Sequence, residues 1–180
     1  MTRTHELASQ VTTTCLDEAR EEAGQNEQLS QVVSFQLANE TYGLNIMDVQ
    51  EIILLGEITG IPEVPAYIRG VINLRGKVLP VVDLRLRLGL RASGASEHTR
   101  IIVVHATGMR FGIIVDGVSQ VVRVDTEQVE PPPTGLTGSD RAYLLGLVKM
   151  DEKIMILLNA EAILSNDTKD RLAQVAKGEA

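Results

Sequence analysis

The stretch QVVSFQLANETYGLNIMDVQEI, residues 31–52, decides the fold, because a second version of it follows later in the chain. The second version is RIIVVHATGMRFGIIVDGVSQV, residues 100–121, and the two align at a constant offset of 69 positions. At this offset Tyr42-Gly43-Leu44 meets Phe111-Gly112-Ile113, and the flanking apolar positions also coincide. A repeat on this scale predicts two structurally similar units before any single motif is considered.

A second pair of segments extends the repeat. GVINLRGKVLPVVDL (70–84) aligns with GLVKMDEKIMILLNA (146–160) at an offset of 76. Each segment predicts a β-hairpin, which turns at Arg75-Gly76 in the first copy and at Asp151-Glu152 in the second. The last polar residue of each segment, Asp83 or Asn159, then stands where it would cap a short helix.

Short apolar runs separated by turn residues are typical of an all-β chain. A unit of four or five short strands is too small for two packed sheets, so closure into a small barrel is the way to remove its edges. We therefore expect two tandem five-stranded β-barrels, over about 31–90 and 100–164 or with strands exchanged between them, in a domain spanning 30–165. The expected flanks are a mobile or marginally helical tail over 1–29 and a C-terminal helix over 166–180.

Composition narrows the classes of function. The 180 residues carry a net charge of −7, which disfavours nucleic acid and anionic membranes. Three Tyr, two Phe and no Trp are too few for a base-stacking surface. The chain has no apolar run long enough to span a bilayer, its start lacks the apolar centre of a signal peptide, and Cys15 is its single cysteine. These features predict a cytoplasmic protein with no nucleic-acid partner and no direct membrane insertion.

The segment 70–90 has some likeness to a phosphate-binding loop, but its details exclude that chemistry. Five residues separate Gly70 from Gly76 where the motif needs four, and Val78 stands where a hydroxyl would hold magnesium. Pro80 lies in the run that follows, which predicts a strand at a sheet edge or with a bulge instead of a helix. The three histidines have no metal-ligand spacing. We predict no catalytic residue, no metal and no cofactor.

Charge is unevenly distributed in the first unit. Residues 40–63 hold five acidic and no basic residues, whereas residues 69–91 hold six basic residues and one acid. Some of these charges are expected to pair. We expect Arg85 and Arg87 at solvated positions of a short helix. Arg75 differs because the following glycine holds it at a hairpin tip, where a planar guanidinium suits recognition of a partner carboxylate or carbonyl.

The segment GVINLRGKVLPVVDLR, preceded by YGLNIMDVQEI and followed by FGIIVDGVSQV, resembles the CheW family of chemotaxis coupling proteins. The resemblance covers about residues 31–164. It implies two SH3-like β-barrels around a shared apolar core, and a scaffold that is not an enzyme. It also implies two partners in the cytoplasm, at membrane-associated receptor arrays. One is the cytoplasmic tip of methyl-accepting chemoreceptors, and the other is the regulatory domain of a CheA-type histidine kinase, which has the same fold.

Carried over residue by residue, the resemblance implies a receptor-facing groove between the barrels. The implied residues are Val49, Glu51, Gly70, Asn73, Arg75 and Gly76. It further implies that Glu51 and Arg75 interact, and that a helical hairpin of the receptor docks in the groove. Contact with the kinase is implied through strand ends of either barrel, including the Asp151-Glu152 hairpin.

Two other functions stay open at this point. The nearest alternative is the same fold serving another chemosensory array, such as one for surface or pilus motility. A small barrel is also a fold that binds oligonucleotides, although the acidic charge and the scarcity of aromatic residues disfavour that function.

Overall fold

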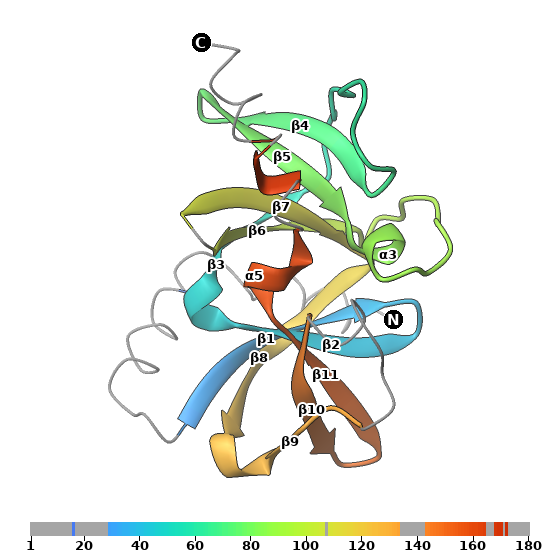
Figure 1. The fold of residues 1–180 in the computed structure, drawn as a ribbon. Coiled ribbons are helices and arrows are strands. Elements are labelled where there is room, and N and C mark those ends of the chain that lie inside the picture. Colours follow the sequence, from blue (N-terminus) through green and yellow to red (C-terminus); the bar gives the residue numbers. More distant parts are fainter. Residues whose placement is uncertain are drawn as a thin grey trace.

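The computed structural model describes residues 16, 29–106, 108–133, 143–164, 168–170 and 172, most of them in β-strands. These strands form two sheets (Figure 1). The strands are β1 (Leu29–Leu37), β2 (Glu40–Asn45), β3 (Val49–Leu54), β4 (Ile68–Leu74), β5 (Lys77–Asp83), β6 (Arg100–Ala106), β7 (Met109–Val115), β8 (Gly117–Asp125), β9 (Val129–Glu130), β10 (Leu144–Met150) and β11 (Lys153–Leu158). Short helical segments are η1 (Ile46–Asp48), α3 (Leu84–Arg87), η2 (Thr126–Gln128) and α5 (Ala160–Ile163).

Each sheet is a small barrel that contains strands of both repeats. Barrel I has the strand order β8-β1-β2-β11-β10-β9, and barrel II, above it in Figure 1, has the order β3-β6-β7-β5-β4. The repeats therefore exchange strands, and neither barrel consists of the contiguous segment 31–90 or 100–164 alone. Barrel I also has a sixth strand, the two-residue β9. The cause of the exchange is the connection after β2, where the three residues of η1 carry the chain onward to the other sheet instead of reversing it.

The strand registers repeat at the offsets found in the sequence. Where β3 pairs with β6, Glu51 stands opposite Val103. Where β8 pairs with β1, Gln120 stands opposite Ser34. At the offset of 69, Gln120 is the equivalent of Glu51, and Val103 is the equivalent of Ser34. The parallel pairs β5–β7 and β11–β2 are equivalent in the same way. The two barrels are therefore two copies of one arrangement, each completed by strands of the other copy.

Many strands are buried on both faces. In β6, Ile101 and Val103 face the interior of barrel II, whereas Ile102 and Val104 belong to a core shared by both barrels. Barrel I has its own interior cluster. This double burial explains the uninterrupted apolar runs in the sequence. Because each fully buried aliphatic side chain contributes about 1.5–3 kcal/mol, the shared core holds the barrels together.

Arg87 of α3 joins the two repeats. Its Cζ lies 5.2 Å from the ring centroids of Tyr67 and Tyr143, which are equivalent positions of the first and second repeat. Its Nε donates a hydrogen bond to the carbonyl of Ile163, the last residue of α5 and the counterpart of Arg87 itself. The prediction that Arg87 is a solvated surface residue is therefore wrong, because two rings and a carbonyl hold its guanidinium.

Arg85 also departs from the expected solvated position. Its Nε donates to Oδ1 of Asp116 at 2.9 Å, and its Nη2 donates to Oδ2 of the same carboxylate. Oδ2 of Asp116 also accepts from the backbone N–H of Ala38 at 2.9 Å, in the turn between β1 and β2. This network links α3 to the connection between β7 and β8 and to a turn of barrel I.

Local predictions hold where the sequence carries a strong signal. Asp83 and Asn159 cap α3 and α5, and each accepts a hydrogen bond from a backbone N–H of its helix. Pro80 lies in β5, which is not an edge strand. However, the ladder between β5 and β7 begins only at Val81, so the edge prediction holds for this end of the strand alone.

The described residues near the two ends are buried. Leu16, in the expected N-terminal tail, is helical and belongs to the shared core. Its helical conformation agrees with the expected marginally helical tail at this one position, and the rest of 1–28 lies outside the described residues. Thr168 and Leu172, in the expected C-terminal helix, are helical and buried. Thr168 Oγ1 lies 2.7 Å from the hydroxyl of Tyr67, with which it is hydrogen-bonded.

Replacing Arg87 by methionine tests the link between the repeats. The side chain keeps its bulk but loses two cation–π contacts and the hydrogen bonds to the carbonyls of Ile163 and Ala162, so we expect the free energy of unfolding to fall by about 2 kcal/mol. Urea unfolding monitored by circular dichroism measures the change. Arg91→Met, at an exposed position, is the control and is expected to stay within about 0.5 kcal/mol of the parent. Equal stabilities for the two variants would contradict the assigned role.

Candidate functional site

Glu51 and Arg75 form a bidentate ion pair at one rim of barrel II. Nη1 and Nη2 of Arg75 donate to Oε1 and Oε2 of Glu51 at 2.9 and 2.8 Å. The two residues come from β3 and from the β4–β5 hairpin, at opposite ends of the strand order, so the pair holds the curled sheet together. We call this rim the mouth of barrel II. The Glu51 side chain is 11% exposed and that of Arg75 is 75% exposed, so a nearly buried carboxylate orients a guanidinium that faces outward.

The hairpin that carries Arg75 has a backbone suited to presenting it. Arg75 and Gly76 have φ values of +53° and +81°, which is the combination of a two-residue type I′ turn. The side-chain Oδ1 of Asn73 accepts a hydrogen bond of 2.9 Å from the N–H of Gly76. Asn73 and Gly76 therefore position Arg75, and all three are exposed.

Gly70 has a structural explanation. Its φ is +145°, and a Cβ built there would lie 2.0 Å from the carbonyl oxygen of Thr59. Thr59 and Val71 exchange two backbone hydrogen bonds of 2.9 and 2.8 Å, which extend the barrel past β3. A side chain at position 70 would separate these segments, so the glycine closes barrel II and does not itself form the surface.

Val49 is fully buried in the shared core, with an exposed fraction of 0%. This side chain therefore anchors the start of β3 in the core, and the receptor contact implied for Val49 stays a prediction. Sequence reasoning missed an exposed residue nearby. Met47, in the η1 connection between the barrels, is 56% exposed. In a chain so rich in apolar residues, the sequence does not indicate which of them reach the surface.

Asp151 and Glu152 lie at the tip of the β10–β11 hairpin of barrel I, and both are exposed. They belong to a different barrel from Arg75 and are not part of the mouth of barrel II. The sequence prediction of a turn at these two residues is confirmed, with a φ of +49° at Asp151.

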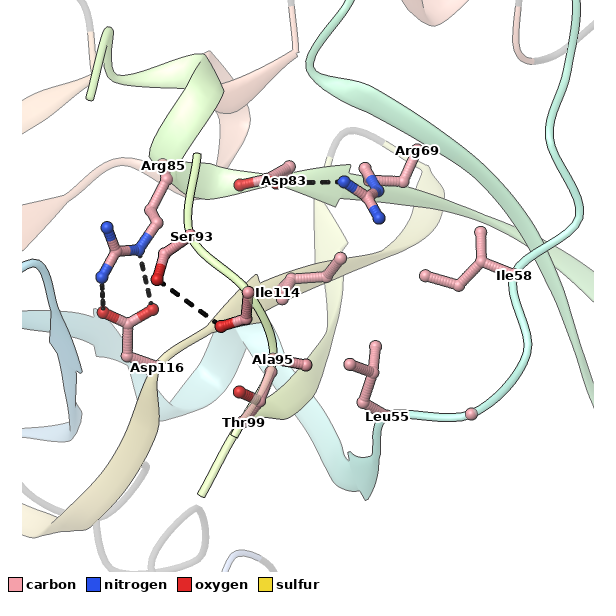
Figure 2. Close-up of a pocket in the computed structure, with 12 residues that line it drawn as sticks. Leu55, Ile58, Arg69, Asp83, Arg85, Ser93, Ala95, Thr99, Ile114 and Asp116 are labelled. Atoms are coloured by element: carbon pink, nitrogen blue, oxygen red, sulfur yellow. Dashed lines mark hydrogen bonds and ion pairs between the residues drawn. The ribbon is translucent and has the colours of Figure 1, made fainter. Parts of the chain in front are cut away.

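A pocket of about 240 Å³ lies at the other end of barrel II from the Glu51–Arg75 pair, where β4 begins and β5 ends. Figure 2 shows Arg85 facing Asp116 on one side of this pocket and Arg69 reaching toward Asp83 on the other. Arg69 Nη1 lies 3.8 Å from Oδ2 of Asp83. The charged groups here neutralise one another in pairs, which stabilises the fold and disfavours a role as free acid or base.

The electrostatics of Asp116 follow from its neighbours. Burial raises the pKa of this carboxyl, but the hydrogen bonds from Arg85 and from the N–H of Ala38 outweigh burial and lower it below its ordinary value. The hydrogen bond to Asp116 raises the pKa of Arg85 in turn. Within the described residues, no group of three or more His, Cys, Asp or Glu side chains is placed to hold a metal ion. The described helices include none that is long and apolar enough to cross a membrane.

Two interlocked barrels, with an oriented arginine at one rim, define a class of protein: a double SH3-like barrel that offers binding surfaces. Residues 31–168 match the CheW-like domain, and the chain belongs to this family. It is 38% identical over 143 residues to "Chemotaxis protein CheW" of Klebsiella aerogenes, covering 79% of this chain and 86% of that protein. A protein of the same name in Treponema pallidum is 32% identical, with coverages of 83% and 91%.

A solved structure agrees with the fold. It is the scaffolding protein TtCheW of Thermoanaerobacter tengcongensis, with a TM-score of 0.72 and 42% sequence identity. The similarity covers 77% of this chain and 94% of that one. The all-β, two-barrel SH3-like fold expected from the sequence is confirmed.

The role of Gly70 is tested by Gly70→Ala. We expect it to lower the free energy of unfolding by about 3 kcal/mol, because the new methyl group meets a backbone carbonyl and the φ is unfavourable for alanine. Chemical denaturation measures the loss. Gly60→Ala is the matched control, because a Cβ at position 60 has no neighbour within 4 Å. An unchanged stability for Gly70→Ala would overturn the structural explanation.

The lowered pKa of Asp116 predicts a pH dependence. Since its folded pKa lies below the unfolded value of about 4, its contribution is complete above that value and is lost as the pH falls through the folded pKa. We expect Asp116→Asn to be less stable than the parent at pH 7, and to lose less stability on going from pH 6 to pH 3. Urea midpoints across this range measure both effects. Parallel curves for the two proteins would show that the carboxylate is not stabilised in the fold.

Proposed function

We propose that this chain is a non-catalytic adaptor that couples the cytoplasmic tips of methyl-accepting chemoreceptors to a CheA-type histidine kinase. Membership of the CheW-like family supports the role, and the observation that carries the receptor half is the Glu51–Arg75 pair. An adaptor needs surfaces whose geometry is set before the partner arrives, since ordering a free side chain on binding costs affinity.

In the proposed role, the receptor binds at the outer edge of the Arg75 guanidinium. Glu51 accepts from two of the five N–H donors of the guanidinium, and the Arg75 side chain is 75% exposed, so the other three donors are available to a partner. A helical hairpin that offers a carboxylate or a carbonyl at this rim is the partner that suits them. Asn73 and Gly76 hold the turn, and the exposed Met47 supplies an apolar contact between the barrels.

In the proposed role, the kinase binds on the other barrel, barrel I. Asp151 and Glu152 stand at an exposed hairpin tip of barrel I, which leaves the receptor rim of barrel II free for simultaneous binding. Simultaneous binding of two partners is the requirement for a coupling protein. The same surfaces serve a chemosensory array for surface or pilus motility, and the identity of the partners distinguishes the two cases.

The test of the receptor half is the binding of a receptor cytoplasmic fragment to Glu51→Gln/Arg75→Ala. The double variant removes the exposed guanidinium without leaving a buried carboxylate unpaired. We expect affinity for the receptor fragment to fall about tenfold, equivalent to about 1.4 kcal/mol, with affinity for the kinase within twofold of the parent. Isothermal titration calorimetry measures both.

Lys77→Ala is the control for this experiment, because it removes an exposed cation from the same hairpin without touching the ion pair. Wild-type receptor affinity in a double variant that is cooperatively folded would refute the assignment of this rim. Failure of the parent protein to bind either partner would refute the adaptor role itself.

A further inference from the structure

Barrel I has its own counterpart of the Glu51–Arg75 closure, and this counterpart carries no ion pair. In the repeated register, Gln120 of β8 occupies the position of Glu51 in β3. At the tip of the β10–β11 hairpin, Asp151 occupies the position of Arg75. The backbone at these two tip residues is alike, with φ values of +49° and +53°. At the next position Glu152 replaces a glycine and does not share its positive φ.

An amide and a carboxylate cannot form the ion pair that closes barrel II. Glu51 is buried beneath its arginine, whereas Gln120 and Asp151 are exposed, and in the described residues no side-chain hydrogen bond or ion pair joins these two. A cavity of about 480 Å³ occupies the rim between them, which we call the mouth of barrel I. Its volume lies within the range of sites that bind ligands.

The inner wall of this mouth is rich in hydrogen-bond acceptors. The Nε2 of Gln36 donates to the hydroxyls of Thr41 and Ser119 at 3.3 and 3.1 Å, so its donors are used internally and its carbonyl oxygen remains available. The hydroxyl of Ser34 donates to the backbone carbonyl of Gln120 at 2.9 Å and accepts from the N–H of the same residue at 3.3 Å, so this pair is satisfied within the wall. The side-chain carbonyl of Gln120 adds a further acceptor.

The floor and the rim of the mouth add an apolar surface and charge. Met150 and Met155 form the floor. The carboxylates of Asp151 and Glu152 stand at the rim, with one ammonium group, that of Lys153. A planar cation with several donors and apolar faces matches a site with acceptors on its walls, carboxylates at its rim and thioethers beneath.

We propose that the mouth of barrel I binds an arginine side chain presented by a partner protein, in the place that Arg75 fills from within in barrel II. The duplication supports this directly, because the equivalent site of the same chain already holds a guanidinium. That the partner is the regulatory domain of the kinase rests on the proposed function, whereas the arginine site itself does not. The two claims therefore have separate tests.

The first test uses the full chain labelled with ¹⁵N and titrated with N-acetyl-arginine amide. We expect saturable shifts of the amide signals of Ser119, Gln120, Asp151 and Glu152. N-acetyl-citrulline amide, which has nearly the same shape and no charge, is expected to bind at least tenfold more weakly. No shifts at these positions, or equal affinity for the two probes, would overturn the proposal.

The second test closes the mouth. Gln120→Glu with Asp151→Arg rebuilds the ion pair of barrel II, so we expect at least tenfold weaker binding of N-acetyl-arginine amide and of the kinase regulatory domain, with the fold retained. The control is Gln128→Glu with Glu127→Arg, which makes the same charge change at exposed positions of η2 outside the mouth. This control is expected to bind both as the parent does.

The outcomes separate the site from its partner. If the closing double variant still binds N-acetyl-arginine amide, the arginine site is overturned, regardless of its affinity for the kinase domain. Kinase binding that survives closure, while probe binding is lost, would overturn the assignment of the kinase as the occupant. Failure of the parent chain to bind the kinase at all would contradict the proposed function and leave the probe result as the test of the site. Self-association that closure abolishes would overturn the assignment to a different protein.

Discussion

The guanidinium of Arg87, held between Tyr67 and Tyr143, links the two repeats beside the shared core that holds the barrels together. The two rings are equivalent residues of the repeat, and the carbonyl that Arg87 bonds belongs to its own counterpart, Ile163. A guanidinium is planar, always charged and rich in donors, so it satisfies both rings and a helix end at once. No aliphatic side chain offers this combination.

Strand exchange couples the two barrels to one another. Each barrel contains strands of both repeats, and each exchanged strand contributes one face to a barrel interior and the other to the shared core. Neither barrel can therefore open without disturbing the other. A frame of this kind holds the two mouths in a constant relation, and a preorganised surface loses little entropy on binding.

The two mouths show how one arrangement acquires two chemistries. In barrel II, Glu51 holds Arg75 and turns its remaining donors outward. In barrel I, Gln120 and Asp151 stand at the same positions, and the rim encloses a cavity with an acidic tip. The backbone register is common to both, so the two rims differ in the side chains that stand at equivalent positions.

The sequence by itself determined the duplication, the two hairpin turns, the caps at Asp83 and Asn159 and the pairing of Glu51 with Arg75, the last through resemblance to a family. The turns and caps are local signals set by individual residues, and the duplication follows from the spacing of motifs. Only the tertiary structure decided the exchange of strands, the burial of Val49 and the roles of Arg85 and Arg87. An offset between repeats says which residues are equivalent but not which copy they pair with. Whether an arginine meets water, a carboxylate or two rings depends on segments far away in the chain, which the sequence around it does not contain.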